Sequence, residues 1–365
     1  MQEESVRRGY DHSHAVRRSK RKFIATHCPQ PHMRTTMLRH SIFPAMRCKT
    51  RLGRPMMSRL GSAVLVAVLS CTCSITLADD PIPGIGPVGD IEVVAADLQF
   101  TEGPTVDGEG NLYFTDIPAD RIHRWTEADG LSVFLEPAGH ANGLMWTAGS
   151  GLRACQMDGK LVGIDIKTRE VTTLAEQFEG ARFNAPNDLV VDRSGGTYFT
   201  DPLYRAPTPL PQGMMSVYYV SAAGEVSRVV DDMPAPNGIL LSPDEKTLYV
   251  IPSQDSKVMC YPVLEPGKLG EGEVFCEIQQ TEDSNGKQGG DGAAIDTKGN
   301  LYFTTALGIQ VFTPAADYLG AIAFPEHPAN VTFGGSDFKT LIVTARTSVY
   351  RVRMEAIGHR YPGAQ

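Results

Sequence analysis

The chain is poor in cysteine, and the few cysteines that it has follow no known pattern. It contains 7 in 365 residues, and four of them precede residue 79. The other three, Cys155, Cys260 and Cys276, have no Cys-x-x-Cys spacing, which argues against a zinc site or a disulfide framework. They are either three buried thiols or include one Cys260 to Cys276 bridge, as in some exported proteins. Ser253 and Ser256 lack a Gly-x-Ser-x-Gly context, which argues against a serine hydrolase.

Basic charge is scarce beyond the first part of the sequence. Residues 1–60 hold 14 of the 34 Lys and Arg residues and only 3 acids, and residues 61–78 hold no charge. Residues 79–365 therefore contain 20 basic and 39 acidic residues, a formal charge near −19. Such a surface repels phosphate backbones, so no nucleic-acid partner is expected. It attracts cations instead.

Long apolar runs are absent except at residues 61–78, which follow Arg54 and Arg59 and end in Thr-Leu-Ala. This pattern predicts a signal peptide over residues 56–78, cleaved near Ala78, and export to the periplasm or the medium. The alternative is an uncleaved membrane anchor. Otherwise no stable membrane span is expected in the mature protein. Residues 1–55 are either a basic leader or lie upstream of a true start at Met56 or Met57. Residues 79–90 are predicted as a linker, residues 91–355 as the folded domain and residues 356–365 as a C-terminal tail.

Helical periodicity longer than a turn or two is also absent between residues 91 and 353, where one unit repeats instead. Its clearest copies are TVDGEGNLYFTD, VVDRSGGTYFTD and AIDTKGNLYFTT, each with an acidic or amide residue five positions before the aspartate of the turn. Weaker copies extend the set to six, spaced by 39 to 54 residues. The six residues are Glu102, Asn142, Asn187, Asn237, Asp291 and Asn330.

This period, with several short strands in each unit, predicts an all-β fold, a six-bladed β-propeller with four-stranded blades around a central channel. The shared register predicts that the six polar side chains converge at one mouth of the channel. Residues 91–94 are expected to pair with the last blade near residues 348–352 and to close the ring. A β-sandwich, the alternative architecture, would not bring six repeats to one point.

Carboxylates and amides gathered on one axis would be costly if they were left dry and unpaired. A bound cation removes that cost, and a set of oxygen ligands favours Ca²⁺, then Mg²⁺ or Mn²⁺, over Zn²⁺. The alternative is that each residue only caps its own loop by hydrogen bonding to the backbone.

Five motifs in this order resemble the gluconolactonase, regucalcin (senescence marker protein) and luciferin-regenerating-enzyme family of six-bladed propellers, over about residues 91–353. They are Thr101-Glu102-Gly103-Pro104, Asn184-Ala185-Pro186-Asn187-Asp188, Pro236-Asn237-Gly238, Gly290-Asp291-Gly292 and Phe333-Gly334-Gly335. The resemblance implies hydrolysis of a sugar lactone. It also implies one divalent cation, most often calcium in the bacterial branch, with Asp291 as general base or acid. The implied cation ligands are Glu102, Asn187, Asn237 and Asp291.

In such a site the cation polarises the lactone carbonyl, and Asp291 moves a proton from the attacking water to the leaving ring oxygen. Asn142, Asn330, Tyr204 and Arg205 are candidate substrate contacts, each with a purely structural role as the alternative. Animal members of the family have an Arg two positions before the ligand Asn. Here that position is Ala185, so the sugar itself stays open.

Two other functions remain open at this point. Related propellers hydrolyse phosphotriesters with a similar ring of metal ligands. Alternatively, calcium only closes the channel of a non-catalytic propeller whose rim binds a protein or a glycan.

Overall fold

The computed structural model describes residues 81–149, 151–282, 284, 286 and 288–361. The predicted leader, signal peptide and cleavage site all lie outside the described residues. Within the described part, no helix is long and apolar enough to cross a membrane.

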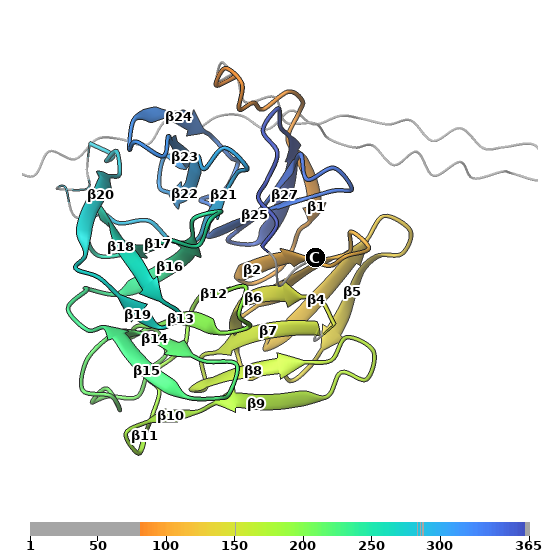
Figure 1. Ribbon diagram of the computed structural model, residues 1–365. Coiled ribbons are helices and arrows are strands. Elements are labelled where there is room, and N and C mark those ends of the chain that lie inside the picture. Colours follow the sequence, from red (N-terminus) through yellow and green to blue (C-terminus); the bar gives the residue numbers. More distant parts are fainter. Residues whose placement is uncertain (1–80, 150, 283, 285, 287, 362–365) are drawn as a thin grey trace, which may run out of the picture. The chain divides into compact units, whose positions relative to one another are not determined.

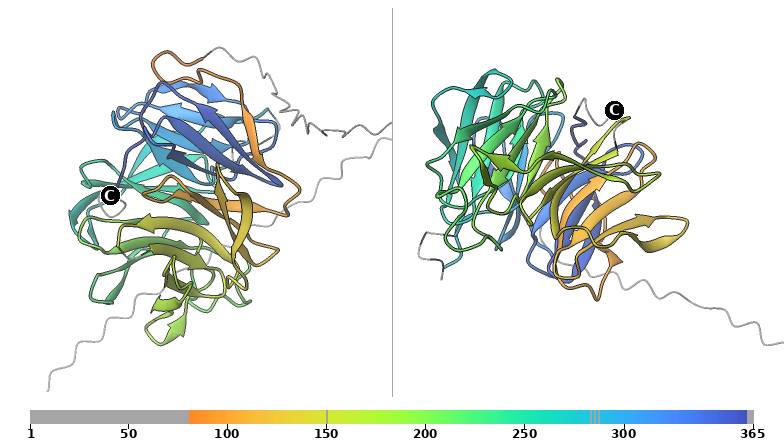
Figure 2. Two further views of the ribbon diagram at one scale, coloured as in Figure 1. Left: turned by 90° about the vertical axis from the view of Figure 1, so that its right-hand side faces the viewer. Right: turned by 90° about the horizontal axis from the view of Figure 1, so that it is seen from below.

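The described chain forms six antiparallel sheets arranged in a ring, which Figure 1 shows along the channel and Figure 2 from two further sides. The protein is therefore a six-bladed β-propeller with four-stranded blades, as the repeat predicted. Its described residues contain no α-helix.

Each blade begins with its innermost strand and continues outward. Blade 1 contains β2 (Thr101–Val106), β3 (Leu112–Asp116), β4 (Arg121–Thr126) and β5 (Gly130–Leu135). Blade 2 contains β6 (Ala141–Thr147), β7 (Gly151–Gln156), β8 (Lys160–Ile164) and β9 (Val171–Ala175). Blade 3 contains β12 (Leu189–Val191), β13 (Thr197–Asp201), β14 (Ser216–Val220) and β15 (Val226–Val230). A hairpin of β10 (Gln177–Phe178) and β11 (Ala181–Arg182) precedes blade 3 in the sequence.

The other three blades follow the same order, with one extra strand. Blade 4 contains β16 (Pro236–Leu241), β17 (Thr247–Pro252), β18 (Lys257–Glu265) and β20 (Glu273–Glu277), and the short β19 (Lys268–Leu269) pairs with the end of β18. Blade 5 contains β21 (Ala293–Ile295), β22 (Leu301–Thr305), β23 (Gly308–Phe312) and β24 (Tyr318–Ile322). Blade 6 contains β25 (Asn330–Gly334), β26 (Thr340–Ala345), β27 (Ser348–Arg353) and β1 (Glu92–Ala95).

The ring is closed by β1, which is the outermost strand of blade 6. Glu92 lies opposite Arg351 and Val93 opposite Tyr350 in an antiparallel pair with β27. The predicted pairing of residues 91–94 with the last blade is confirmed. Because a closed ring has no free terminal blade, the two ends of the domain stabilise each other.

In blades 1, 3 and 5, the aspartate of the repeat shapes the turn between the first two strands of the blade. The Oδ1 atom of Asp192 accepts hydrogen bonds from the backbone N–H groups of Ser194 and Gly196, at 2.8 and 2.9 Å. Asp107 and Asp296 accept the equivalent pairs in blades 1 and 5. A short acidic side chain that bonds its own turn explains why the repeat carries aspartate there.

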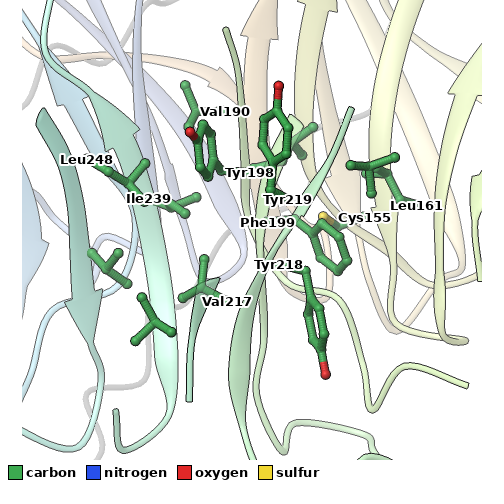
Figure 3. Close-up of a cluster of buried hydrophobic side chains, with 14 of the residues drawn as sticks. Cys155, Leu161, Val190, Tyr198, Phe199, Val217, Tyr218, Tyr219, Ile239 and Leu248 are labelled. Atoms are coloured by element: carbon green, nitrogen blue, oxygen red, sulfur yellow. The ribbon is translucent and has the colours of Figure 1, made fainter. Parts of the chain in front are cut away.

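Apolar side chains fill the spaces between neighbouring blades. Tyr198 and Phe199 of β13 and Tyr218 of β14 pack between side chains of blade 2, such as Leu161, and side chains of blade 4, such as Ile239 (Figure 3). The inner strands β3, β13 and β22 are buried at every position. Both faces of each sheet are covered by a neighbouring blade, so these strands show apolar runs and little alternation.

The three cysteines of the domain are buried and free. Cys260 lies opposite Glu273 and Cys276 opposite Val258 in the pair of β18 and β20, so the two sulfurs belong to different cross-strand pairs. The alternative that includes a Cys260 to Cys276 bridge is therefore wrong.

The residues on either side of the repeats pack against the propeller. Ile82 and Ile85, in the stretch expected to be a linker, are buried in the cluster between blades 5 and 6. Residues 356–361, expected to form a tail, cross the end of the channel opposite the mouth, which we call the floor. There the N–H of His359 donates to the carbonyl of Ile295 at 2.9 Å, and the hydroxyl of Tyr361 donates to that of Leu241 at 2.8 Å.

Candidate functional site

The six polar residues of the repeat lie at equivalent places around one mouth of the channel. Glu102, Asn142, Asn237 and Asn330 stand within the first two residues of the innermost strands of their blades, and Asn187 and Asp291 stand two residues before β12 and β21. The N–H of Gly143 donates to the carbonyl of Asn187 at 2.7 Å, and that of Gly238 to the carbonyl of Asp291 at 3.0 Å. Neighbouring blades therefore touch at these residues. All six are buried except Asp291, which is partly exposed.

Glycine follows the polar residue in four of the six blades, and the close approach of the strands requires it. A Cβ atom on Gly103 would lie 2.0 Å from the carbonyl oxygen of Asn142, and one on Gly238 would lie 2.3 Å from that of Asp291. Only glycine tolerates such contacts with a neighbouring backbone. In blade 3 the equivalent residue is Asp188, which adds a third carboxylate near the axis. Asp188 was not among the predicted site residues, although Asn-Asp in place of Asn-Gly marks the position in the sequence.

A threonine hydroxyl of one blade fixes the backbone of the next. Thr115 donates to the carbonyl of Asn142 at 3.0 Å, and Thr200 donates to that of Asn237 at 2.7 Å. Both threonines are wholly buried. They occupy the third position of the repeated Tyr-Phe-Thr, so the repeat contained the signal for them, but these residues were predicted only as part of a strand.

Two buried aspartates hold the loops that lead to the polar ring. Asp201, at the end of β13, accepts the N–H groups of Asn184 and Ala185 at 2.8 and 2.7 Å. Asp116, at the end of β3, accepts those of Gln99 and Phe100 at 3.1 and 3.0 Å. Each pair of bonds ends within three residues of a proposed ligand. The two carboxylates therefore set the course of the loops that carry Asn187 and Glu102.

Three carboxylates near the axis repel one another. Burial and the charges of Asp291 and Asp188 raise the pKa of Glu102 well above its usual value, against hydrogen bonds that lower it. Burial and the charge of Asp188 raise the pKa of Asp291 to about 7, while Arg346 and Asn237 lower it. Burial raises the pKa of Asp188 to about 6. Each pKa would return toward its ordinary value beside a positive charge.

These residues fit a hard divalent cation. The Oδ1 atom of Asn142 is buried and accepts no hydrogen bond from any described residue. A buried carbonyl oxygen without a donor is costly, as are carboxylates that repel each other, and a cation removes both costs. No three His, Cys, Asp or Glu side chains of the described part are gathered closely enough to hold a metal by themselves. Amide oxygens therefore have to take part, which suits calcium more than zinc.

Of the other predicted substrate contacts, two lie at the mouth and one does not contact the polar ring. Asn330 lies in the ring, and its amide nitrogen donates to the Oδ2 atom of Asp188 at 3.4 Å. The ring of Tyr204 packs against Ile117, Met157 and Ala185 above the mouth, and its hydroxyl bonds to Ser253. Arg205 is exposed and forms no hydrogen bond or ion pair with the described side chains. The structure thus brings Asn330 and Tyr204 to the mouth but shows no contact between Arg205 and the ring.

Comparisons with known proteins identify the family of this propeller. Residues 100–347 match the model of the SMP-30/gluconolactonase/LRE-like region. A gluconolactonase of Zymomonas mobilis is 33% identical over 299 residues, which cover 73% of this chain and 82% of the relative. A 6-deoxy-6-sulfogluconolactonase of Pseudomonas putida is 27% identical over 237 residues, 64% of this chain and 78% of that protein.

Solved structures show the same propeller. A gluconolactonase of Xanthomonas campestris has a TM-score of 0.66 at 26% identity, covering 73% of this chain and 89% of that chain. Regucalcin of Agrobacterium tumefaciens has a TM-score of 0.65 at 24% identity, covering 75% and 96%. The region that matches the family model includes the innermost strand of every blade and every residue of the polar ring, so the chain belongs to the SMP-30/gluconolactonase/LRE-like family.

Proposed function

We propose that this protein is a metal-dependent lactonase that opens a sugar lactone, with Asp291 as general base and acid. The observation that carries the proposal is the convergence of Glu102, Asn187, Asn237 and Asp291 on one mouth, beside the unpaired oxygen of Asn142. The relatives from Zymomonas mobilis and Pseudomonas putida, both described as sugar lactonases, support the same reaction for this chain.

Glu102, Asn187, Asn237 and Asp291 are the residues that would hold the cation. Their charge and their oxygen ligands favour Ca²⁺. When bound, a divalent cation supplies Lewis acidity that polarises a carbonyl and stabilises negative charge on its oxygen. Glu102 is buried, so its role is to hold and neutralise the ion. Asn187 and Asn237 contribute neutral oxygens, which leave most of the positive charge of the ion available to the substrate.

Asp291 is the carboxylate best placed for proton transfer. It is partly exposed at the mouth, whereas Glu102 is buried, so water and substrate reach Asp291 first. Its carboxylate takes a proton from the attacking water and delivers that proton to the ring oxygen that leaves. Asn142 and Asn330 can orient the substrate hydroxyls. The partial exposure of Asp291 also favours catalysis over a binding propeller whose ion is sealed beneath an apolar plug.

The test is acid release from D-glucono-1,5-lactone by the purified chain, measured at constant pH above the spontaneous rate, with and without chelator. We expect activity with Ca²⁺, its loss on chelation and its return when Ca²⁺ is restored. Asp291→Ala should lower kcat by a factor of about 10³ or more, because the proton transfer and one ligand are lost together. Turnover that persists in the chelator would remove the metal from the mechanism.

Glu102→Gln separates loss of the ion from loss of the fold. The variant keeps the size of the side chain but removes its charge, so Ca²⁺ binding followed by calorimetry should weaken by at least tenfold. The melting temperature of the cation-free variant should equal or exceed that of the cation-free wild type, because a buried, repelled carboxylate is gone. Unchanged Ca²⁺ affinity would mean that Glu102 is not a ligand.

A further inference from the structure

Arg346 lies on the mouth face of the propeller, in the turn between β26 and β27. Its carbonyl accepts the N–H of Thr101 at 2.8 Å, one residue before Glu102. Its φ angle of 48° is left-handed, a conformation that non-glycine residues adopt at a cost. The backbone contact therefore fixes the turn where Arg346 reaches over the start of blade 1.

The guanidinium of Arg346 faces no carboxylate within ion-pair distance among the side chains that the structure describes. Its Nη2 atom lies 3.4 Å from Nδ1 of His327, and its carbon lies 5.1 Å from the centre of the Phe100 ring. Phe100 stands two residues before Glu102. Stacking and one weak hydrogen bond orient the guanidinium but leave most of its N–H donors free.

Glu326, on the loop just before β25, does not neutralise this charge. Its Oε2 atom accepts the N–H and the hydroxyl of Thr347 at 2.8 and 2.9 Å. Its Oε1 atom accepts the hydroxyls of Ser348 and of Tyr350, the latter at 2.9 Å. The carboxylate of Glu326 is thus fully engaged in holding the turn.

Other arginines of blade 6 are paired, which sets Arg346 apart. Arg351 forms an ion pair with Glu92 at 2.7 Å, and Arg353 forms one with Asp337. Both pairs lie away from the mouth. A cation left unpaired at the mouth of a domain with a large excess of acid is the arrangement expected of a binding group for an anion.

Arg346 is placed to bind a substituent of the substrate that lies away from the reacting bond. Its charge lowers the pKa of Asp291, but no hydrogen bond joins the two side chains. Burial and the charge of Arg346 lower the pKa of His327, so the imidazole is neutral at pH 7 and its Nε2–H can donate beside the guanidinium. Phe100, on which the guanidinium stacks, packs against a buried apolar cluster of Ile117, Met157 and Ala185.

We propose that the lactone carries a negatively charged group, a carboxylate or a phosphate ester, and that Arg346 binds it with help from His327. Arg346 would then be a specificity residue that distinguishes an acid-bearing sugar lactone from a neutral one. The inference rests on the proposed lactonase function and adds the charge of its substrate.

The test compares matched pairs of lactones with the Ca²⁺-loaded chain. D-glucaro-1,4-lactone differs from D-glucono-1,4-lactone by a carboxylate, and 6-phospho-D-glucono-1,5-lactone differs from D-glucono-1,5-lactone by a phosphate. We expect kcat/KM to be at least tenfold higher for the anionic member of one pair, mainly through KM. The pair with the larger preference identifies the anion.

Arg346→Gln should reduce that ratio of kcat/KM values at least tenfold, and Arg346→Lys should restore part of it, since a point charge replaces a planar fork. Arg193→Gln is the matched control. Arg193 is an exposed arginine in the turn between β12 and β13 of blade 3, so this variant should keep the ratio. Hydrolysis of both members at equal rates, or a ratio unchanged in Arg346→Gln, would overturn this inference and leave the lactonase intact. If no lactone is hydrolysed, both proposals fail.

Discussion

The two ends of the channel are made by the same six strands and treat polar groups in opposite ways. At the mouth, Glu102, Asp188 and Asp291 are crowded together with raised pKa values. At the floor, His359 and Tyr361 join the backbones of blades 5 and 4 and close the channel. Between the two ends lies a cavity of about 110 Å³. The floor and the contacts between blades therefore stabilise the fold. The polar ring at the mouth lowers its stability, as expected of residues arranged to bind an ion and a substrate.

Among the substitutions that test this contrast, the largest loss of stability is expected at Asp201, which holds the loop before Asn187. Asp201→Ala leaves the N–H groups of Asn184 and Ala185 without an acceptor, and an unpaired buried donor costs about 1–3 kcal/mol. We expect the free energy of unfolding to fall by about 2–4 kcal/mol and Ca²⁺ affinity to fall by about tenfold or more, as measured by denaturant titration and calorimetry.

Asp165→Ala is the control for that experiment. Asp165 also accepts two backbone N–H groups, from Lys167 and Thr168. It does so in the exposed turn between β8 and β9, the two outermost strands of blade 2. Its loss should change the free energy of unfolding less than the loss of Asp201 and leave Ca²⁺ affinity unchanged. Equal losses of affinity in the two variants would show that Asp201 does not position Asn187.

The second prediction concerns pH and the protein without its cation. Asp291 and Asp201 have pKa values of about 7 in the fold, raised mainly by burial, and ordinary values when unfolded. Folding therefore binds protons, and the stability that they contribute is full below about pH 4 and is lost as the pH rises through 7. In chelator, the free energy of unfolding should fall by roughly 3–5 kcal/mol between pH 5 and pH 8.

Saturating Ca²⁺ should flatten this profile, because an ion beside Asp291 favours its charged form. Asp201 accepts backbone N–H groups away from the ring, so a smaller dependence should remain. The measurement is urea denaturation at several pH values with and without the ion. Parallel profiles in the two conditions would contradict the assignment of Asp291 as a ligand.

The smallest effect is expected at the floor. Tyr361→Phe removes the hydroxyl that donates to Leu241 but keeps the ring, so the free energy of unfolding should fall by about 1 kcal/mol. Lactone turnover should change by less than twofold. A large loss of activity with little loss of stability would mean that the floor and the mouth are coupled, and the division of labour between them would be wrong.

Much of the propeller could be predicted because a repeated sequence unit shows which residues occupy equivalent positions in successive blades. A fixed offset of five residues between Asn187 and Asp192, seen again at Glu102 and Asp291, placed these side chains in equivalent positions before any coordinate was known. The closing strand followed from the same count. The roles of the ring residues in catalysis and ion binding stay predictions, since they depend on an ion and a substrate.

Other features could not be read from local patterns. Tyr361 follows the last repeat in a short stretch rich in Gly and Pro, and only the closed ring provides the carbonyl of Leu241, 120 residues earlier, as its partner. Asp188 was visible as part of a polar pair. Its meaning emerged when blades 1, 2, 4 and 5 showed a glycine in close contact at the same position.

The threonine hydroxyls between blades have a consequence for how such a molecule can change. The hydroxyl of Thr200 in blade 3 holds the backbone of Asn237 in blade 4. Such a repeat thus contains its own proposed ligand and also the threonine that positions the ligand of the next repeat. A single repeat exchanged between two family members would therefore disturb two seams at once. Units transplanted in adjacent pairs, with the boundary kept whole, are the pieces from which a new version of this site can be assembled.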